Sequence, residues 1–348
     1  MKTRTRKIPR ILFLLFVAAL LAIGAVLAGF QSWRTNRIAE LYSESEIAKT
    51  SAGDVEFARR GAGRPVLVIH DALGGFDQGI ALAPFLDSGE FETISISRPG
   101  YLRTPLATGL LPENQADAAA ALLESLSIPR VSIVAFGWGA PAAVQLAARH
   151  PDRVQSLALV APVLSALQPT PEFPPFPQAA NAALSGDVGA WLFHKEAQEQ
   201  PARALEQTYK LTANGSPADR SAWADFVSSD PTQLENFRNL ALSLSPLSQR
   251  ETGIRNDILQ IRALPDLPLE KISAPLLVLF GGLDKAVPLA TSEAARARLP
   301  ASATVQIIPD AGHLIFLGRG GPTAAARLME FLGKNSGPTP AAEEGGGE

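Results

Sequence analysis

Two residues late in the chain could together move a proton. Asp284 follows one buried apolar run in PLLVLFGGLDKAVP, and His313 follows another in TVQIIPDAGHLIF. An imidazole acts as a general base when a carboxylate fixes its tautomer and stabilises its charged form. Asp284 and His313 are therefore the candidate catalytic pair. The structural alternatives are a loop histidine near a helix and an aspartate that starts the turn before Pro288.

The position that should supply the attacking atom has no side chain. The segment VSIVAFGWGA predicts a strand that turns directly into a helix, with the small residues Ala135 and Gly139 on either side of Gly137. A sharp turn of this kind normally lifts a nucleophile above a sheet. Gly137 leaves that nucleophile slot vacant. The nearest hydroxyl of this segment, on Ser132, lies inside the predicted strand.

Alternating strands and helices position these residues. Short apolar, β-branched runs predict strands at 65–70, 91–97, 131–136, 154–160, 275–280 and 304–308. DVEFARR, at 54–60, predicts an early antiparallel strand. Helical patterns lie between several of them, at 113–126, 140–150 and 290–299. The alternation predicts an α/β fold with a mostly parallel sheet and helices on both faces. Ligands bind beyond the carboxyl ends of such strands, which is where Gly137, Asp284 and His313 fall.

The sequence resembles the α/β-hydrolase family over about residues 50–332. The stretches that carry the resemblance are VLVIHDALGGFDQG, SRPGYLRTP, IVAFGWGAPAAVQLAARHPDRVQSLALVAP and the segments around Asp284 and His313. The chain order of nucleophile, acid and histidine is typical of this fold. The resemblance implies an eight-stranded sheet and a helical lid made by an insertion. It also implies hydrolysis of an ester, amide, epoxide or carbon–halide bond through a covalent intermediate.

The elbow and one loop depart from the family pattern. Family members carry Ser, or Asp in the epoxide and haloalkane branch, where Gly137 stands, and Gly-Trp-Gly here resembles the Asp-Trp-Gly of that branch. The resemblance implies an oxyanion hole made by the backbone N–H of Trp138 and one from Asp71 or Ala72. That loop usually opens His-Gly, whereas here His70 is followed by an aspartate. A carboxylate on Asp71 would oppose oxyanion stabilisation unless it points away.

The N-terminus predicts a membrane helix. Residues 11–30 form an uncharged run of about 20 residues, the length needed to cross a bilayer. The basic segment 1–10 precedes it, which favours a cytoplasmic N-terminus and a folded body on the extracytoplasmic side. The alternative is a signal peptide cleaved near Ala28, which would leave a secreted or periplasmic protein.

Composition excludes several kinds of site. The 348 residues include no cysteine, which rules out thiol catalysis and Cys-ligated metals. Without the five basic residues of 1–10, the balance is 31 − 5 = 26 basic against 34 acidic residues, and such an acidic body is unsuited to nucleic acid. We expect no cofactor, because no dinucleotide fingerprint follows the first strand. We expect no metal site, because the four scattered histidines lack ligand spacing.

The body should divide into parts according to these patterns. The expected parts are a linker at 31–50, a first core segment at 51–162, a lid insertion at 163–270, a second core segment at 271–333 and a disordered tail at 334–348.

Two classes of function remain. Loss of a triad nucleophile lowers turnover about 10⁶-fold in a serine hydrolase. The main expectation is therefore a membrane-anchored, catalytically impaired family member that binds a small apolar molecule or an unknown protein partner. The alternative is a hydrolase of an ester or epoxide bond in which Asp284 and His313 activate a water above Gly137. A third hypothesis, an esterase whose Ser was replaced at this one position, is disfavoured by the unusual Asp71 and Trp138 nearby.

Overall fold

The first compact unit of the chain is a single long helix. The computed structural model describes residues 7–87, 89–167 and 186–337. It divides the chain into two units, Met1–Ser43 and Glu44–Glu348. Helix α1 (Lys7–Ser43) makes up the described part of the first unit, and its portion Leu12–Ser43 is long and apolar enough to cross a membrane.

Both halves of the segment predicted as a linker, 31–50, have regular structure. Helix α1 continues to Ser43, and strand β1 (Glu46–Thr50) follows. The segment QSWRTNRIAELYS contains neither Gly nor Pro, so a helix already formed by the apolar run can propagate through it at little cost. Strand β1 was not predicted, because EIAKT is short and carries no apolar run.

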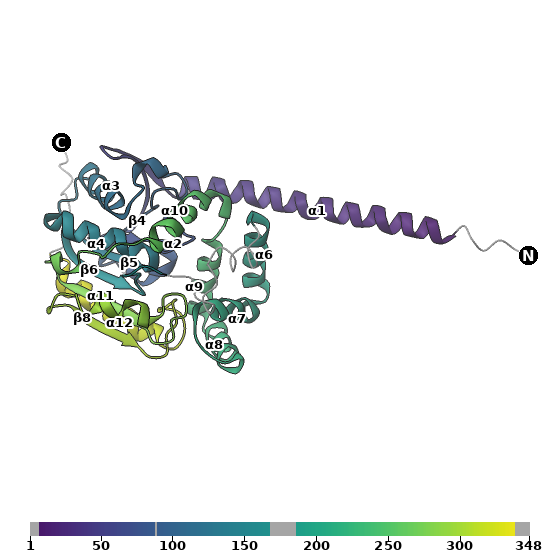
Figure 1. The fold of residues 1–348 in the computed structure, drawn as a ribbon. Coiled ribbons are helices and arrows are strands. Elements are labelled where there is room, and N and C mark those ends of the chain that lie inside the picture. The colour runs from purple at the N-terminus through teal and green to yellow at the C-terminus, as the bar shows by residue number, and fades with distance from the viewer. Residues whose placement is uncertain (1–6, 88, 168–185, 338–348) are drawn as a thin grey trace, which may run out of the picture. The chain divides into compact units, whose positions relative to one another are not determined.

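An eight-stranded sheet lies at the centre of the second unit (Figure 1). Its strands occur in the order β1-β2-β4-β3-β5-β6-β7-β8; the first two pairings are antiparallel and the others are parallel. Besides β1, the strands are β2 (Gly53–Gly61), β3 (Arg64–Ile69), β4 (Phe91–Ile96), β5 (Val131–Phe136), β6 (Val154–Val160), β7 (Leu276–Gly281) and β8 (Thr304–Ile308). The expected eight-stranded, mostly parallel sheet is confirmed.

Helices cover both faces of this sheet. In β3, Leu67 and Ile69 belong to one apolar cluster and Val66 and Val68 to another, because successive side chains of a strand point to opposite faces. The first cluster includes α3 (Pro112–Ser125) and α4 (Ala140–Arg149), and the second includes α12 (Gly321–Asn335). The core is therefore two apolar layers with the sheet between them. The remaining core helices are α2 (Phe76–Leu82) and α11 (Glu293–Arg296), the latter shorter than the predicted helix at 290–299.

The insertion between β6 and β7 is helical, as expected. Its described helices are α6 (Gly186–Glu199), α7 (Pro201–Thr212), α8 (Pro217–Ser229), α9 (Pro231–Leu242) and α10 (Glu251–Arg262). Helices α6 to α9 form a group of their own in Figure 1, with an apolar cluster that includes Leu205, Val227 and Phe237. Residues 168–185 of the insertion and 338–348 of the predicted tail lie outside the described residues. The tail cannot begin at 334, because α12 continues to Asn335.

Candidate active site

The elbow after β5 has the expected backbone shape. Strand β5 ends at Phe136, a single 3₁₀ turn covers Gly137–Gly139, and α4 starts at once. Gly137 has a φ of +42°, in the left-handed region that L-residues seldom adopt. A Cβ on Gly139 would collide with the backbone carbonyl of His70, so only glycine lets the elbow approach β3 this closely.

The predicted acid and histidine meet at the carboxyl edge of the sheet. Asp284 follows β7 and His313 follows β8, and the Asp284 Oδ2 atom lies 2.8 Å from Nδ1 of His313. The other oxygen of Asp284 accepts the backbone N–H of Val287 at 2.8 Å. The Asp284 side chain is 2% exposed and that of His313 9%. The imidazole of His313 is thus fixed at Nδ1 by a buried carboxylate whose two oxygens each make a hydrogen bond.

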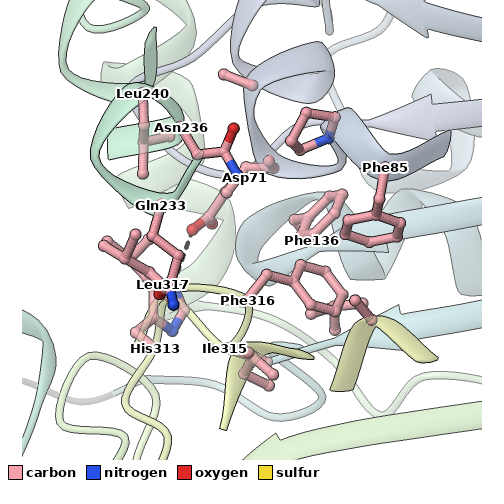
Figure 2. Close-up of a pocket in the computed structure, with 18 of the residues that line it drawn as sticks. Asp71, Phe85, Phe136, Gln233, Asn236, Leu240, His313, Ile315, Phe316 and Leu317 are labelled. Carbon is pink, nitrogen blue, oxygen red and sulfur yellow. Dashed lines mark hydrogen bonds and ion pairs between the residues drawn. The ribbon is translucent and has the colours of Figure 1, made fainter. Parts of the chain in front are cut away.

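The carboxylate of Asp71 lies on the other side of the ring. Its Oδ2 atom is 2.8 Å from Nε2 of His313, and its Oδ1 atom accepts the backbone N–H of Trp138 at 2.7 Å. Strands β3 and β5 are parallel neighbours with Ile69 opposite Ala135, so position 71 is in register with Gly137 two residues further on. Figure 2 shows the Asp71 carboxylate directed at the His313 ring.

This placement changes the interpretation of the vacant elbow. The expected space for a water above Gly137 holds the Asp71 carboxylate, because a Cβ built on Gly137 would collide with that side chain. Asp71 does not point away from the predicted oxyanion hole either, since it takes the Trp138 N–H for itself. Within the described residues, the only side chain that a hydrogen bond brings to Nε2 of His313 is therefore a carboxylate from a different loop.

The two flanking carboxylates decide the charge of His313. Carboxylates only accept hydrogen bonds, so both ring nitrogens must carry hydrogen for both bonds to form. Burial disfavours the charged ring, but Asp284 and Asp71 outweigh burial and raise the pKa of His313 well above its usual value. Burial likewise opposes ionisation of Asp71, but His313 and the N–H groups of Trp138 and Ala72 lower the pKa of this carboxyl. These pKa directions and the two hydrogen bonds favour the imidazolium form of His313 at rest.

An apolar pocket opens in front of Asp71 and His313. Its volume is about 270 Å³, and aromatic and aliphatic side chains dominate the wall opposite the two polar residues (Figure 2). Phe316 packs edge-to-face against Phe85 and Phe136, with ring centroids 4.9 and 6.0 Å apart. From the insertion, α9 contributes Gln233, Asn236 and Leu240 to the lining. The pocket suits a small, mostly apolar molecule with few polar groups.

Comparison with known proteins identifies the family. The family model described as "alpha/beta hydrolase fold" matches residues 64–319. The chain belongs to the α/β-hydrolase fold family. The similarity therefore covers strands β3 to β8, the elbow, the insertion and the loops that carry Asp71, Asp284 and His313.

Three relatives of this α/β hydrolase illustrate the range of similarity. It is 24% identical to the uncharacterized hydrolase YcgS of Bacillus subtilis over 287 residues, which cover 82% of this chain and 98% of YcgS. It is 30% identical to a pimeloyl-(acyl-carrier protein) methyl ester esterase of Aromatoleum aromaticum, over 77% of this chain and 97% of the esterase. An α/β hydrolase fold protein from Nakamurella multipartita matches in structure with a TM-score of 0.75 and 30% identity, over 83% of this chain and 98% of that one.

The insertion is hydrogen-bonded to both loops that carry the candidate acid and histidine. The Thr212 carbonyl at the end of α7 accepts the backbone N–H groups of His313 and Lys285, at 3.0 and 3.2 Å. The N–H of Asn214 is bonded to the carbonyl of Leu283 at 2.7 Å. These backbone bonds tie the insertion to the loops that carry Asp284 and His313. Sequence reasoning missed them, because backbone contacts between distant segments leave no pattern in residue type.

Sequence reasoning also missed the part played by Asp71. The signal was present in two places, as an acidic residue after His70 and a missing side chain at Gly137. Taken together with the parallel pairing of β3 and β5, the two departures compensate each other in space. Considered separately, Gly137 indicated a lost nucleophile and Asp71 indicated an impaired oxyanion hole.

Proposed function

We propose that this α/β hydrolase cleaves an ester or epoxide bond in a small, largely apolar substrate, with Asp284 and His313 managing the proton transfers of hydrolysis. The observation that carries the proposal is the position of His313, which is held by Asp284 at one ring nitrogen while the other faces the pocket wall at Asp71. A histidine in this arrangement can give a proton to a leaving group and then, as the neutral ring, take one back from water.

The pocket supports the substrate class. At about 270 Å³ it is slightly smaller than the ~300–1,000 Å³ typical of pockets for drug-sized ligands. Its polar groups are concentrated at Asp71 and His313 and on α9, whereas Phe85, Phe136 and Phe316 provide an apolar wall. One relative is named as a pimeloyl-(acyl-carrier protein) methyl ester esterase, which agrees with an ester bond as the one that is cleaved.

The binding-only function expected from the vacant elbow receives no support. Two of the relatives carry the names of a hydrolase and an esterase. In addition, a carboxylate lies at the position where a family member would present its nucleophile. Catalytic impairment therefore no longer follows from Gly137 alone.

The test is turnover of a panel of short-chain aryl esters and terminal epoxides. We expect turnover by the wild type and a fall of about 10²-fold or more in His313→Ala, the usual contribution of a positioned acid–base group. The matched control is His150→Ala, because His150 also bonds an aspartate, Asp117 at 2.8 Å, but on the surface at the end of α4. Equal rates in all three proteins, or no turnover of any panel member, would reject the proposal.

We also infer that α1 anchors this body to a membrane, with the N-terminus in the cytoplasm. The apolar run of α1 and the basic residues before it support the inference. We expect the full chain to remain with membranes after alkaline carbonate extraction and the body to be digested by protease added from the extracytoplasmic side. N-terminal sequencing that starts at Gly29 would instead identify a cleaved signal peptide.

A further inference from the structure

Asp71 and Gly137 are sterically complementary. The Asp71 carboxylate fills the space that a side chain on Gly137 would need, and the parallel register of β3 and β5 places the two positions next to each other. The carboxylate contacts the ring of His313, as an elbow nucleophile would, and it also accepts the N–H of Trp138, which the family pattern assigns to the oxyanion hole. Its side chain is 13% exposed and lines the pocket, so a substrate can reach it.

The backbone of Asp71 is held by an independent set of bonds. The Nε2 atom of His70 accepts the Arg98 N–H at 3.0 Å, which leaves Nδ1 to donate to the Asp71 carbonyl at 2.6 Å. The Arg98 guanidinium donates to the same carbonyl at 3.2 Å and to the His70 carbonyl at 3.1 Å. It is itself paired with Asp257 of α10, at 2.8 and 2.5 Å. Such a scaffold preorganises a reactive group and links it to the insertion.

We propose that Asp71 is the nucleophile of this hydrolase and that it attacks a saturated carbon, as in an epoxide, to form a covalent ester with the substrate. The proposal rests on the function proposed above and deepens it, because it moves the attacking atom from the elbow to the loop after β3. A carboxylate oxygen that accepts one hydrogen bond keeps a further lone pair for the attack.

The hydrogen bonds around Asp71 favour a saturated carbon over an acyl carbon. Attack on an acyl carbon would create an oxyanion on the substrate, but the Trp138 N–H that should stabilise it already bonds Asp71 Oδ1. Attack on an epoxide creates an alkoxide instead, which the His313 imidazolium can neutralise with a proton, so this step does not need the Trp138 N–H. When water later attacks the enzyme ester, the negative charge develops on a carboxyl oxygen of Asp71 itself, where the Trp138 N–H lies ready.

The steps balance in protons and bonds. One oxygen of Asp71 bonds an epoxide carbon, the carbon–oxygen bond of the ring breaks, and the resulting alkoxide receives, through water, the proton of the His313 imidazolium. Esterified Asp71 no longer carries the charge that helps to stabilise the imidazolium, so the neutral ring of His313 can persist.

Hydrolysis of the ester then regenerates the site. Water gives a proton to His313 and bonds the carboxyl carbon of Asp71. The bond between that carbon and the bridging ester oxygen, which came from Asp71, then breaks. This oxygen leaves with the substrate and takes the proton of the newly formed carboxylic acid. The diol leaves, and the aspartate and imidazolium are restored.

The decisive experiment follows the oxygen of the attacking water. Full-length wild-type protein, in excess over a terminal epoxide, completes at most one turnover per site in H₂¹⁸O. We expect ¹⁸O in the peptide that contains Asp71 and none in the diol. Label in the diol with an unlabelled Asp71 would overturn the covalent step while leaving the hydrolase function intact. No diol from any epoxide would overturn the substrate class, and turnover of esters would then decide the proposed function by itself.

A variant of Asp71 distinguishes two roles of this residue, that of a nucleophile and that of a side chain that only blocks the site. We expect Asp71→Asn to lose at least 10³-fold in epoxide turnover and to incorporate no label in a single turnover. Asp152→Asn is the matched control, because Asp152 is an exposed carboxylate before β6, at the opposite edge of the sheet, and should leave the rate unchanged. A rise in turnover in Asp71→Asn would show that Asp71 inhibits the site and would contradict the proposal.

Discussion

The carboxylate of Asp71 lies 2.8 Å from Nε2 of His313 and occupies the place that a side chain on Gly137 would take. The elbow supplies only a backbone N–H to this arrangement, and the loop after β3 supplies the side chain that the elbow supplies in other family members. The arrangement keeps an acid, a histidine and a nucleophilic group together without any of the usual nucleophiles at the elbow. The predictions below follow from this arrangement.

A serine at the elbow should work only when Asp71 makes room for it. In Gly137→Ser the new side chain collides with the Asp71 carboxylate, so we expect no labelling by a serine-directed fluorophosphonate. In the double variant Asp71→Gly/Gly137→Ser, the hydroxyl can reach His313, and labelling should be about 10²-fold faster or more, as a positioned base provides. Equal labelling of the single and double variants would contradict the steric relationship.

The buried pair of Arg98 and Asp257 should matter for both stability and activity. Their side chains are 2% and 6% exposed, so Asp257→Ala leaves a buried charge unpaired and should cost about 3–5 kcal/mol in denaturant unfolding. Replacing both residues, in Arg98→Met/Asp257→Leu, should recover much of that stability but not turnover, because the Asp71 carbonyl still lacks its guanidinium donor.

The matched control for this pair lies on the surface. Arg149 also donates hydrogen bonds to both carboxylate oxygens of Asp117, but the two side chains are 44% and 38% exposed. Asp117→Ala should therefore lower the free energy of unfolding by no more than about 1 kcal/mol. A loss in Asp257→Ala as small as this control, or full turnover in the double replacement, would show that the pair does not hold the Asp71 loop.

Stability should depend on pH through His313. Its pKa is raised in the folded protein from the ordinary value of about 6.5, so its ion pairs contribute fully below that pH and are lost as pH rises through the folded value. The difference in unfolding free energy between wild type and His313→Gln should therefore be largest near pH 6 and shrink by about 1.4 kcal/mol per unit of pKa elevation on the alkaline side. A difference that grows between pH 6 and pH 10 would contradict the imidazolium.

The sequence was sufficient for seven of the eight strands and for the pairing of Asp284 with His313. Both depend on local signals, namely apolar runs that predict strands and the parallel topology that brings strand ends to one edge. The direction of the Asp71 side chain was not predictable in this way, because it depends on contacts with Trp138 and His313, far away in the chain. Strand β1 was missed for a similar reason, since its pairing with β2 and not its composition makes it a strand.

The most direct test of the account is the mass of the His313→Gln protein after incubation with a terminal epoxide. This variant retains the Asp71 carboxylate but lacks both the acid that protonates the alkoxide and the base that activates water. The alkoxide can still take its proton from solvent water, so the covalent ester should form slowly and, without a base to hydrolyse it, persist. We predict the added mass of one epoxide molecule per chain, located on the peptide that contains Asp71 and absent when Asp71→Asn is introduced as well. An unmodified protein, or the same adduct in the presence of Asp71→Asn, would contradict the account.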